Sequence, residues 1–164
     1  MSSPPRTYEK VLAAFNAAQP MDYRMHQLDL AVRAARDDYI DIVRNVMLED
    51  PHLLDTQASP AGQWSGWTVM GHAARWGRLT IVQHLVDRGA SVDAQCRDGY
   101  TPLTLACAGK HRNVVEFLLY KGADVNLRAK DGMTAISQAR QSGPKEIFDL
   151  VAKVIQLLYF YYLF

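Results

Sequence analysis

Residues 98–126 read DGYTPLTLACAGKHRNVVEFLLYKGADVN, and the pattern of this stretch recurs on both sides of it. The glycines Gly66, Gly99 and Gly132 are 33 residues apart, and each is followed two residues later by a threonine. An alanine stands five positions after each threonine, and two apolar pairs then follow in every unit. Self-similarity at a fixed period of this length is typical of stacked supersecondary units rather than of a globular enzyme core.

The parts of the unit also predict its local structure. Thr101 and Pro102 predict the start of a short helix, because Thr can cap exposed N–H groups and Pro at the first position gives up no bonded one. Apolar residues at helical spacing predict a second helix over residues 113–120. Gly122 predicts the end of that helix, since a left-handed backbone conformation costs glycine little.

This unit closely resembles the ankyrin repeat, and the resemblance covers roughly residues 26–156. It implies an all-α ankyrin-repeat solenoid of helix-turn-helix units with hairpin-like fingers. We expect four repeats, at about residues 26–64, 65–97, 98–130 and 131–156. The flanking segments are then an N-terminal extension with a short capping helix, residues 1–25, and an apolar aromatic tail, residues 157–164. The face of the capping helix would consist of Tyr8, Val11, Leu12 and Phe15.

The chain departs from the ankyrin pattern at several points. The family usually has His after Thr-Pro-Leu, and here Gly71, Thr104 and Ser137 stand instead, so the histidine's hydrogen bonds must be supplied otherwise or lost. The first repeat aligns with the second at an offset of 39, which places six extra residues in a loop near residues 50–63. The fourth unit lacks the Gly-Ala-Asp-Val-Asn ending, as is common in terminal repeats.

The composition excludes several functional classes. With 18 basic and 17 acidic residues the formal net charge is +1, which provides no bulk field for nucleic acid or an anionic membrane. Two cysteines argue against a disulfide scaffold and favour a reducing, intracellular compartment, namely the cytoplasm, with the nucleus left open. The N-terminus lacks the apolar run of a secretory signal.

The C-terminal run is the unusual feature of the chain. From Leu150 to Phe164 the polar residues are Lys153 and Gln156, and these fifteen residues are too few to span a bilayer, which needs about 20. We expect a lengthened last helix that packs back on the fourth repeat. The alternatives are an exposed patch for dimerisation, a partner or a membrane surface, and a truncated or misread gene end.

The sequence predicts no enzyme, cofactor or metal site. The histidines lack metal-ligand spacing, and the two cysteines are eleven residues apart. The glycines of the second repeat are not spaced as a phosphate-binding loop. His72 aligns with Leu105, which favours a packing role, and Cys107 near His111 has no third group to orient the pair.

The predicted function is a non-enzymatic protein–protein interaction module. The resemblance implies that a partner meets the concave face, formed by the finger tips and the first helix of each unit. Residues of the types that dominate interface hot spots occupy the variable positions, and they favour a partner with an acidic or mixed apolar surface. The predicted partner-binding residues are Trp64, Trp67, Arg75, Trp76, Arg88, Arg97, Tyr100, Lys121 and Met133.

Other interpretations stay open at this point. The tryptophans could instead pack on the insertion and on the first repeat. The main contact could be made by the C-terminal tail of an adaptor or self-associating protein, with a partner or a membrane surface. The basic residues among the aromatics could bind nucleic acid, although the near-neutral net charge argues against it. Asn126 lies in a motif that resembles the one recognised by an asparaginyl hydroxylase of ankyrin domains.

Overall fold

The computed structural model describes residues 21–57 and 66–163, and their regular secondary structure is helical throughout. The elements are α2 (Met21–Asp37), α3 (Ile40–Glu49), the 3-10 turn η1 (Pro51–Leu53), α4 (Val69–Arg75), α5 (Leu79–Asp87), α6 (Pro102–Gly109), α7 (Arg112–Tyr120), α8 (Ala135–Ser142) and α9 (Lys145–Leu163). The predicted all-α fold is confirmed, and α7 begins one residue before the helix predicted over residues 113–120. The predicted helix around Tyr8 lies outside the described residues.

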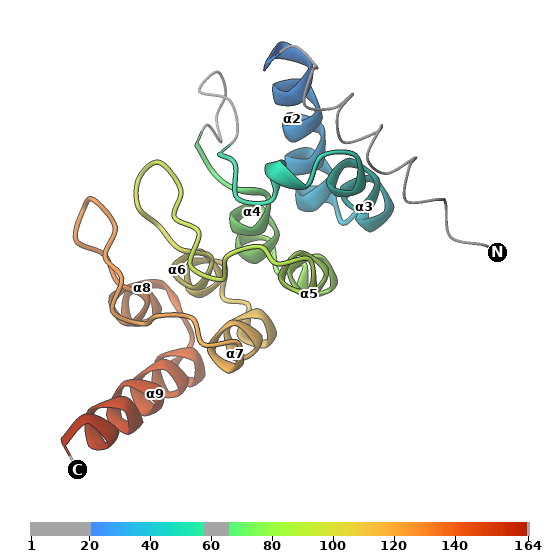
Figure 1. Ribbon diagram of the computed structural model, residues 1–164. Helices are drawn as coiled ribbons and strands as arrows, with labels where there is room; N and C mark the ends of the chain where they lie inside the picture. Colours follow the sequence, from blue (N-terminus) through green and yellow to red (C-terminus); the bar gives the residue numbers. More distant parts are fainter. Residues whose placement is uncertain (1–20, 58–65, 164) are drawn as a thin grey trace.

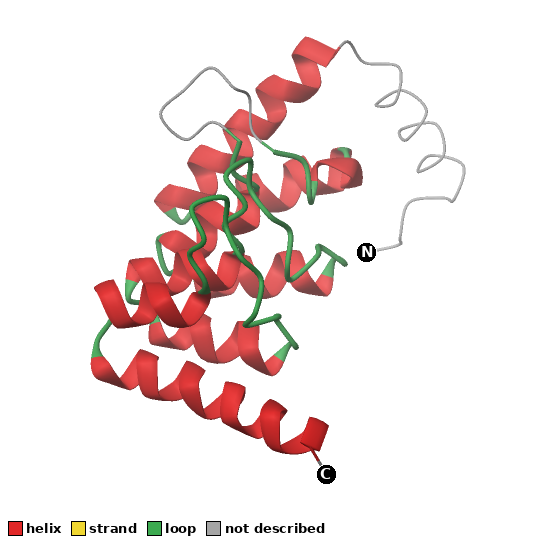
Figure 2. Ribbon diagram, turned by 90° about the vertical axis from the view of Figure 1, so that its left-hand side faces the viewer, coloured by secondary structure: helices red, strands yellow, loops and turns green. Residues whose placement is uncertain are grey.

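The helices form two stacked layers (Figure 1). Helices α2, α4, α6 and α8 contact one another in sequence as the inner layer, and α3, α5, α7 and α9 contact one another as the outer layer. Each inner helix also packs on the outer helix that follows it in the chain. The long loops that precede α6 and α8 leave the stack on the inner-helix side, and Figure 2 shows them side by side. We call these loops, together with residues 66–67 before α4, the fingers.

Three inner helices begin with the predicted threonine cap. The side-chain oxygens of Thr68, Thr101 and Thr134 accept hydrogen bonds from the backbone N–H of Gly71, Thr104 and Ser137, at 3.0, 3.2 and 3.3 Å. The residues in place of the family's histidine also contribute. The hydroxyl groups of Thr101 and Thr104 lie 2.8 Å apart, and Ser137 Oγ accepts from the backbone N–H of Thr134 at 2.8 Å. Hydroxyl groups therefore bond locally in two repeats, and Gly71 provides none.

The core runs along the interface between the two layers. Its fully buried large side chains include Leu28, Met47, Leu85, Leu103, Leu118 and Ile147. The alanines after each cap, such as Ala73 and Ala106, are also fully buried and let neighbouring inner helices approach closely. Gly122 follows Lys121, the C-cap residue of α7, and has a φ of 85°, which confirms the predicted left-handed helix end.

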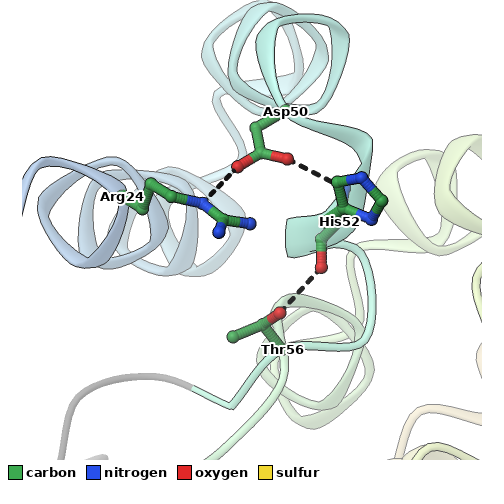
Figure 3. Close-up of polar contacts among 4 residues, drawn as sticks. All are labelled: Arg24, Asp50, His52 and Thr56. Carbon is green, nitrogen blue, oxygen red and sulfur yellow. Dashed lines mark hydrogen bonds and ion pairs between the residues drawn. The ribbon is translucent and has the colours of Figure 1, made fainter. Parts of the chain in front are cut away.

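A polar cluster fixes the loop after α3 (Figure 3). Asp50 is nearly buried, and its carboxylate pairs with Arg24 Nε of α2 at 2.7 Å while accepting from the backbone N–H of His52 at 3.0 Å. The Thr56 hydroxyl donates to the carbonyl of His52 at 2.7 Å. These bonds tie the start of the predicted insertion to the first repeat, and residues 58–65 of that insertion lie outside the described residues.

Helix α9 corrects the prediction for the C-terminal tail. The helix is lengthened as expected, and Ile147 and Val151 are fully buried against the fourth repeat. The prediction that the tail packs back is wrong for the side chains of residues 157–161, which are exposed. At about 1.5 Å per residue, the 19 residues of α9 extend well past the 9 residues of α7. The expected boundaries at residues 25 and 156 fall inside α2 and α9.

Candidate functional site

Three predicted binding residues form one row across the fingers. Trp67, Tyr100 and Met133 are 33 residues apart, and each stands directly before the threonine that caps an inner helix. All three side chains are partly exposed, whereas the threonines beside Trp67 and Tyr100 are buried. We call these three residues the finger row. Because neighbouring inner helices are in contact, the repeat places one large side chain per unit along the same edge of the stack.

Each member of the finger row is held by its own repeat or by the next one. The ring centroids of Trp67 and His72 lie 5.1 Å apart, and the two ring planes are tilted by 45°. The Tyr100 hydroxyl donates a hydrogen bond to Asp131 Oδ2 in the following finger, which raises the pKa of Tyr100 to about 12 and lowers the pKa of Asp131 below its usual value. The tyrosine is therefore a neutral hydrogen-bonding group at physiological pH.

Backbone bonds hold neighbouring fingers together. The N–H of Arg97 donates to the carbonyl of Gly66 at 2.7 Å, and the N–H of Lys130 donates to the carbonyl of Asp98 at 2.8 Å. Gly66 has a φ of 85°, and a Cβ atom built there would lie 2.5 Å from Arg97 Cβ. Only glycine fits this close approach, so the turn glycine of the repeat also fixes where the exposed Arg97 stands.

Arg75 and Trp76 lie at the other end of α4 from Trp67. Arg75 is the last residue of the helix, and its carbonyl accepts a hydrogen bond from His111 Nε2 at 3.1 Å. Trp76 caps the helix and is 39% exposed. Seven helical residues span about 10 Å, so the two tryptophans flank one short helix of the inner layer.

Arg88 and Lys121 are not brought to the finger row. They cap the C-terminal ends of α5 and α7 in the outer layer. Lys121 Nζ lies 4.0 Å from Asp87 Oδ1 and 5.4 Å from the centre of the Phe117 ring, so its charge is engaged on that layer. Of the remaining predicted residues, Trp64 lies outside the described residues.

Asn126 is exposed in the turn that follows α7. Its backbone N–H donates to Asp124 Oδ1 at 2.8 Å, and its neighbour Val125 is buried. The buried Leu118 lies eight residues upstream. The asparagine side chain is thus presented on a short, anchored turn, and hydroxylation of Asn126 stays a prediction.

The cysteines and His72 are buried in the core rather than presented for catalysis. Burial raises the pKa of the Cys107 thiol to about 12 and also raises the pKa of Cys96, so neither is a thiolate nucleophile. His72 is buried beside Trp67, as its alignment with Leu105 suggested. Within residues 21–57 and 66–163, no three His, Cys, Asp or Glu residues are grouped so that they could hold a metal ion.

The end of α9 presents an exposed apolar surface, whereas the sequence favoured packing of this segment on the fourth repeat. Five consecutive residues there have exposed side chains: Leu157, Leu158, Tyr159, Phe160 and Tyr161. The sequence signal for this surface is the absence of charged residues from Val154 onward. Among the described helices, none combines the length and apolarity that a membrane crossing requires.

The geometry defines a two-layer helical repeat solenoid with fingers on its inner side. A sequence model of the family described as ankyrin repeats (3 copies) matches residues 30–129. The chain therefore belongs to the ankyrin-repeat family, whose repeats generally act as protein–protein interaction modules and are typically non-enzymatic. No curated protein matches the chain.

Proposed function

We propose that the chain binds a partner protein through the face formed by the finger row, Arg97 and the Trp76 end of α4. The observation that carries the proposal is the finger row itself: three successive repeats present a large, partly exposed side chain at the same position. The threonines and alanines of the repeat are buried, whereas these three positions are only partly buried and vary in residue type from one repeat to the next. The role requires no catalytic group.

The chemistry of this face favours a partner surface that is acidic or mixed with apolar groups. Arg97 is exposed on a finger whose backbone is bonded to its neighbour, so little backbone entropy is lost when it binds. Trp, Tyr and Arg are the side chains that most often dominate interface energies. Asp98 and Asp131 are exposed nearby, which gives the face both signs of charge. We place the protein in the cytoplasm, where its two free thiols stay reduced.

The test compares variants of the full chain in a binding measurement with a captured partner. Trp76→Ala and Arg97→Ala should each weaken binding about tenfold or more, with little change in melting temperature because both side chains are exposed. Arg44→Ala is the control, since Arg44 is also exposed but lies on α3 in the outer layer. Unchanged affinity in both face variants would place the contact elsewhere.

The end of α9 supports a second candidate function, in which the apolar tail of an adaptor makes the main contact. The exposed residues 157–161 are the specific observation in its favour. A chain ending at Gln156 should then keep its melting temperature but lose self-association in light scattering, or lose a captured partner. A shortened chain that melts well below the full chain would instead mean that the tail stabilises the fourth repeat.

A further inference from the structure

The last part of α9 is exposed on all sides. We call residues 157–161 the terminal apolar segment, and their side chains are exposed by 60%, 39%, 70%, 65% and 81% in order. Successive residues of an α-helix are about 100° apart, so five consecutive exposed positions surround the whole helix. A helix that is apolar all round is found in a protein core or in contact with lipid, not in water.

The repeat stack covers this segment only in part. A hollow of about 460 Å³ separates Leu158 and Tyr159 from the turn that contains Val125 and Asn126. Figure 1 shows the C-terminal end of α9 at the outer limit of the molecule, beyond the other helices. Most of the surface of Tyr159, Phe160 and Tyr161 is therefore open to a contact from outside the described fold.

A second copy of the chain fits this segment poorly. A helix of a second copy that packs on one side of the segment can cover only part of its surface, because the exposed positions surround the helix. Lipid chains, in contrast, can contact a helix on all sides and require no complementary protein surface.

The chemistry of the helix end also fits lipid. Residues 154–163 carry no charged group. Tyr159 and Tyr161 combine an apolar ring with a polar hydroxyl, a combination that is enriched at the membrane interface. Lys145 and Lys153 are balanced by Glu146 and Asp149 on the same helix, so no excess charge selects anionic headgroups.

We propose that the terminal apolar segment inserts into a phospholipid membrane and anchors the ankyrin module to it, whatever the headgroup charge. The inference rests on the second candidate function and specifies what the tail contacts. Burial of apolar surface drives the insertion, so added salt should not release the protein. The fingers lie on the inner side of the stack and stay accessible to a protein partner (Figure 2).

The experiment is flotation of the full chain with vesicles of phosphatidylcholine, with and without phosphatidylserine. We expect flotation with both vesicle types, unchanged at high salt. The double substitution Tyr159→Glu with Phe160→Glu should reduce the bound fraction at least tenfold while circular dichroism and the melting temperature stay unchanged, because both positions are exposed. Leu48→Glu, at a 50% exposed apolar position on α3, is the matched control and should float like the unmodified chain.

Three results would overturn the proposal. The full chain could fail to float, it could float only with phosphatidylserine and be released by salt, or it could form a discrete dimer that ignores vesicles. Failure of the second candidate function looks different: the chain ending at Gln156 would then self-associate and capture protein partners as the full chain does. A chain that fails to float but loses a captured protein on truncation would refute lipid contact and leave the tail as a protein-binding site.

Discussion

Arg78 and His111 stand at the same position of successive repeats, and each directs a side-chain nitrogen to the end of the preceding inner helix. Arg78 Nε donates to the carbonyl of Arg36 at 3.0 Å, and His111 Nε2 donates to the carbonyl of Arg75 at 3.1 Å. The two acceptors are themselves equivalent once the six-residue insertion is counted. Each bond links one repeat to the next and satisfies a carbonyl that the helix leaves without an internal partner.

The histidine link should make stability depend on pH. Burial lowers the pKa of His111 below its usual 6.5, Arg75 and Arg78 lower it further, and the bond to the Arg75 carbonyl opposes them. The unfolded chain therefore binds a proton that the native state excludes, so stability should fall as the pH drops below about 6.5 towards the lowered pKa. Urea unfolding at about pH 8 and about pH 5 measures this loss.

His111→Gln is the matched variant for this measurement, since it keeps a side-chain N–H donor but cannot titrate. Its loss of stability between the two pH values should be smaller than that of the unmodified chain. Some dependence should remain, because burial lowers the pKa of His84 in the same direction. An equal loss in both proteins would show that His111 does not contribute to the pH dependence.

Replacing Lys110 by glycine should stabilise the protein. Lys110 ends α6 with a φ of 65°, a left-handed conformation that disfavours residues with a Cβ atom, and the equivalent residue of the second repeat is Gly77. Lys110→Gly should raise the free energy of unfolding by about 1 kcal/mol. Lys121→Gly is the control, because Lys121 has an ordinary φ of −81° and should gain nothing. Thermal unfolding of the two variants decides the point.

Leu118→Ala should be among the most damaging truncations in the third repeat. Leu118 is fully buried between α7 and its neighbours, so the substitution leaves a cavity and should cost about 2 to 5 kcal/mol. Leu157→Ala removes the same atoms from a 60% exposed position and should leave the free energy of unfolding nearly unchanged. Similar losses in both variants would mean that α9 is packed at residue 157.

The two thiols should resist modification in the native protein. The raised pKa of both groups and the burial of their sulfur atoms leave little accessible thiolate at pH 8. A coloured disulfide reagent should therefore react slowly with the folded chain and rapidly with both cysteines in denaturant. Fast reaction of one thiol under native conditions would show that its finger or helix opens readily.

The sequence predicted the parts of the fold that depend on neighbouring residues in the chain. The threonine caps, the left-handed Gly122 and the buried Cys107 all follow from the repeat pattern, because each needs only its own unit and a copy beside it. The finger row could be located in the same way. The equivalence of Arg78 and His111 was not identified from the sequence, although their spacing of 33 residues could have indicated a shared role.

The end of α9 could not be predicted, because its exposure depends on what lies beside it. An apolar run predicts burial, and Ile147 and Val151 follow that rule. Residues 157–161 do not follow it, because α9 is longer than its neighbour α7 and extends past the end of that helix. The separation of Lys121 from the finger row also needed three-dimensional information. A position before a helix-ending glycine looks variable in sequence, but it lies in the outer layer.

Pro144 makes the fourth repeat the part of the stack that we expect to unfold locally first. Pro144 occupies the place of Arg78 and His111 in the fourth repeat, and its ring carries no hydrogen to donate to the carbonyl at the end of α6. The fourth repeat is therefore joined to the third without this bond. Local opening should begin there, so backbone amides of α8 should exchange with deuterium before those of α4, with the first repeats persisting as the more protected unit.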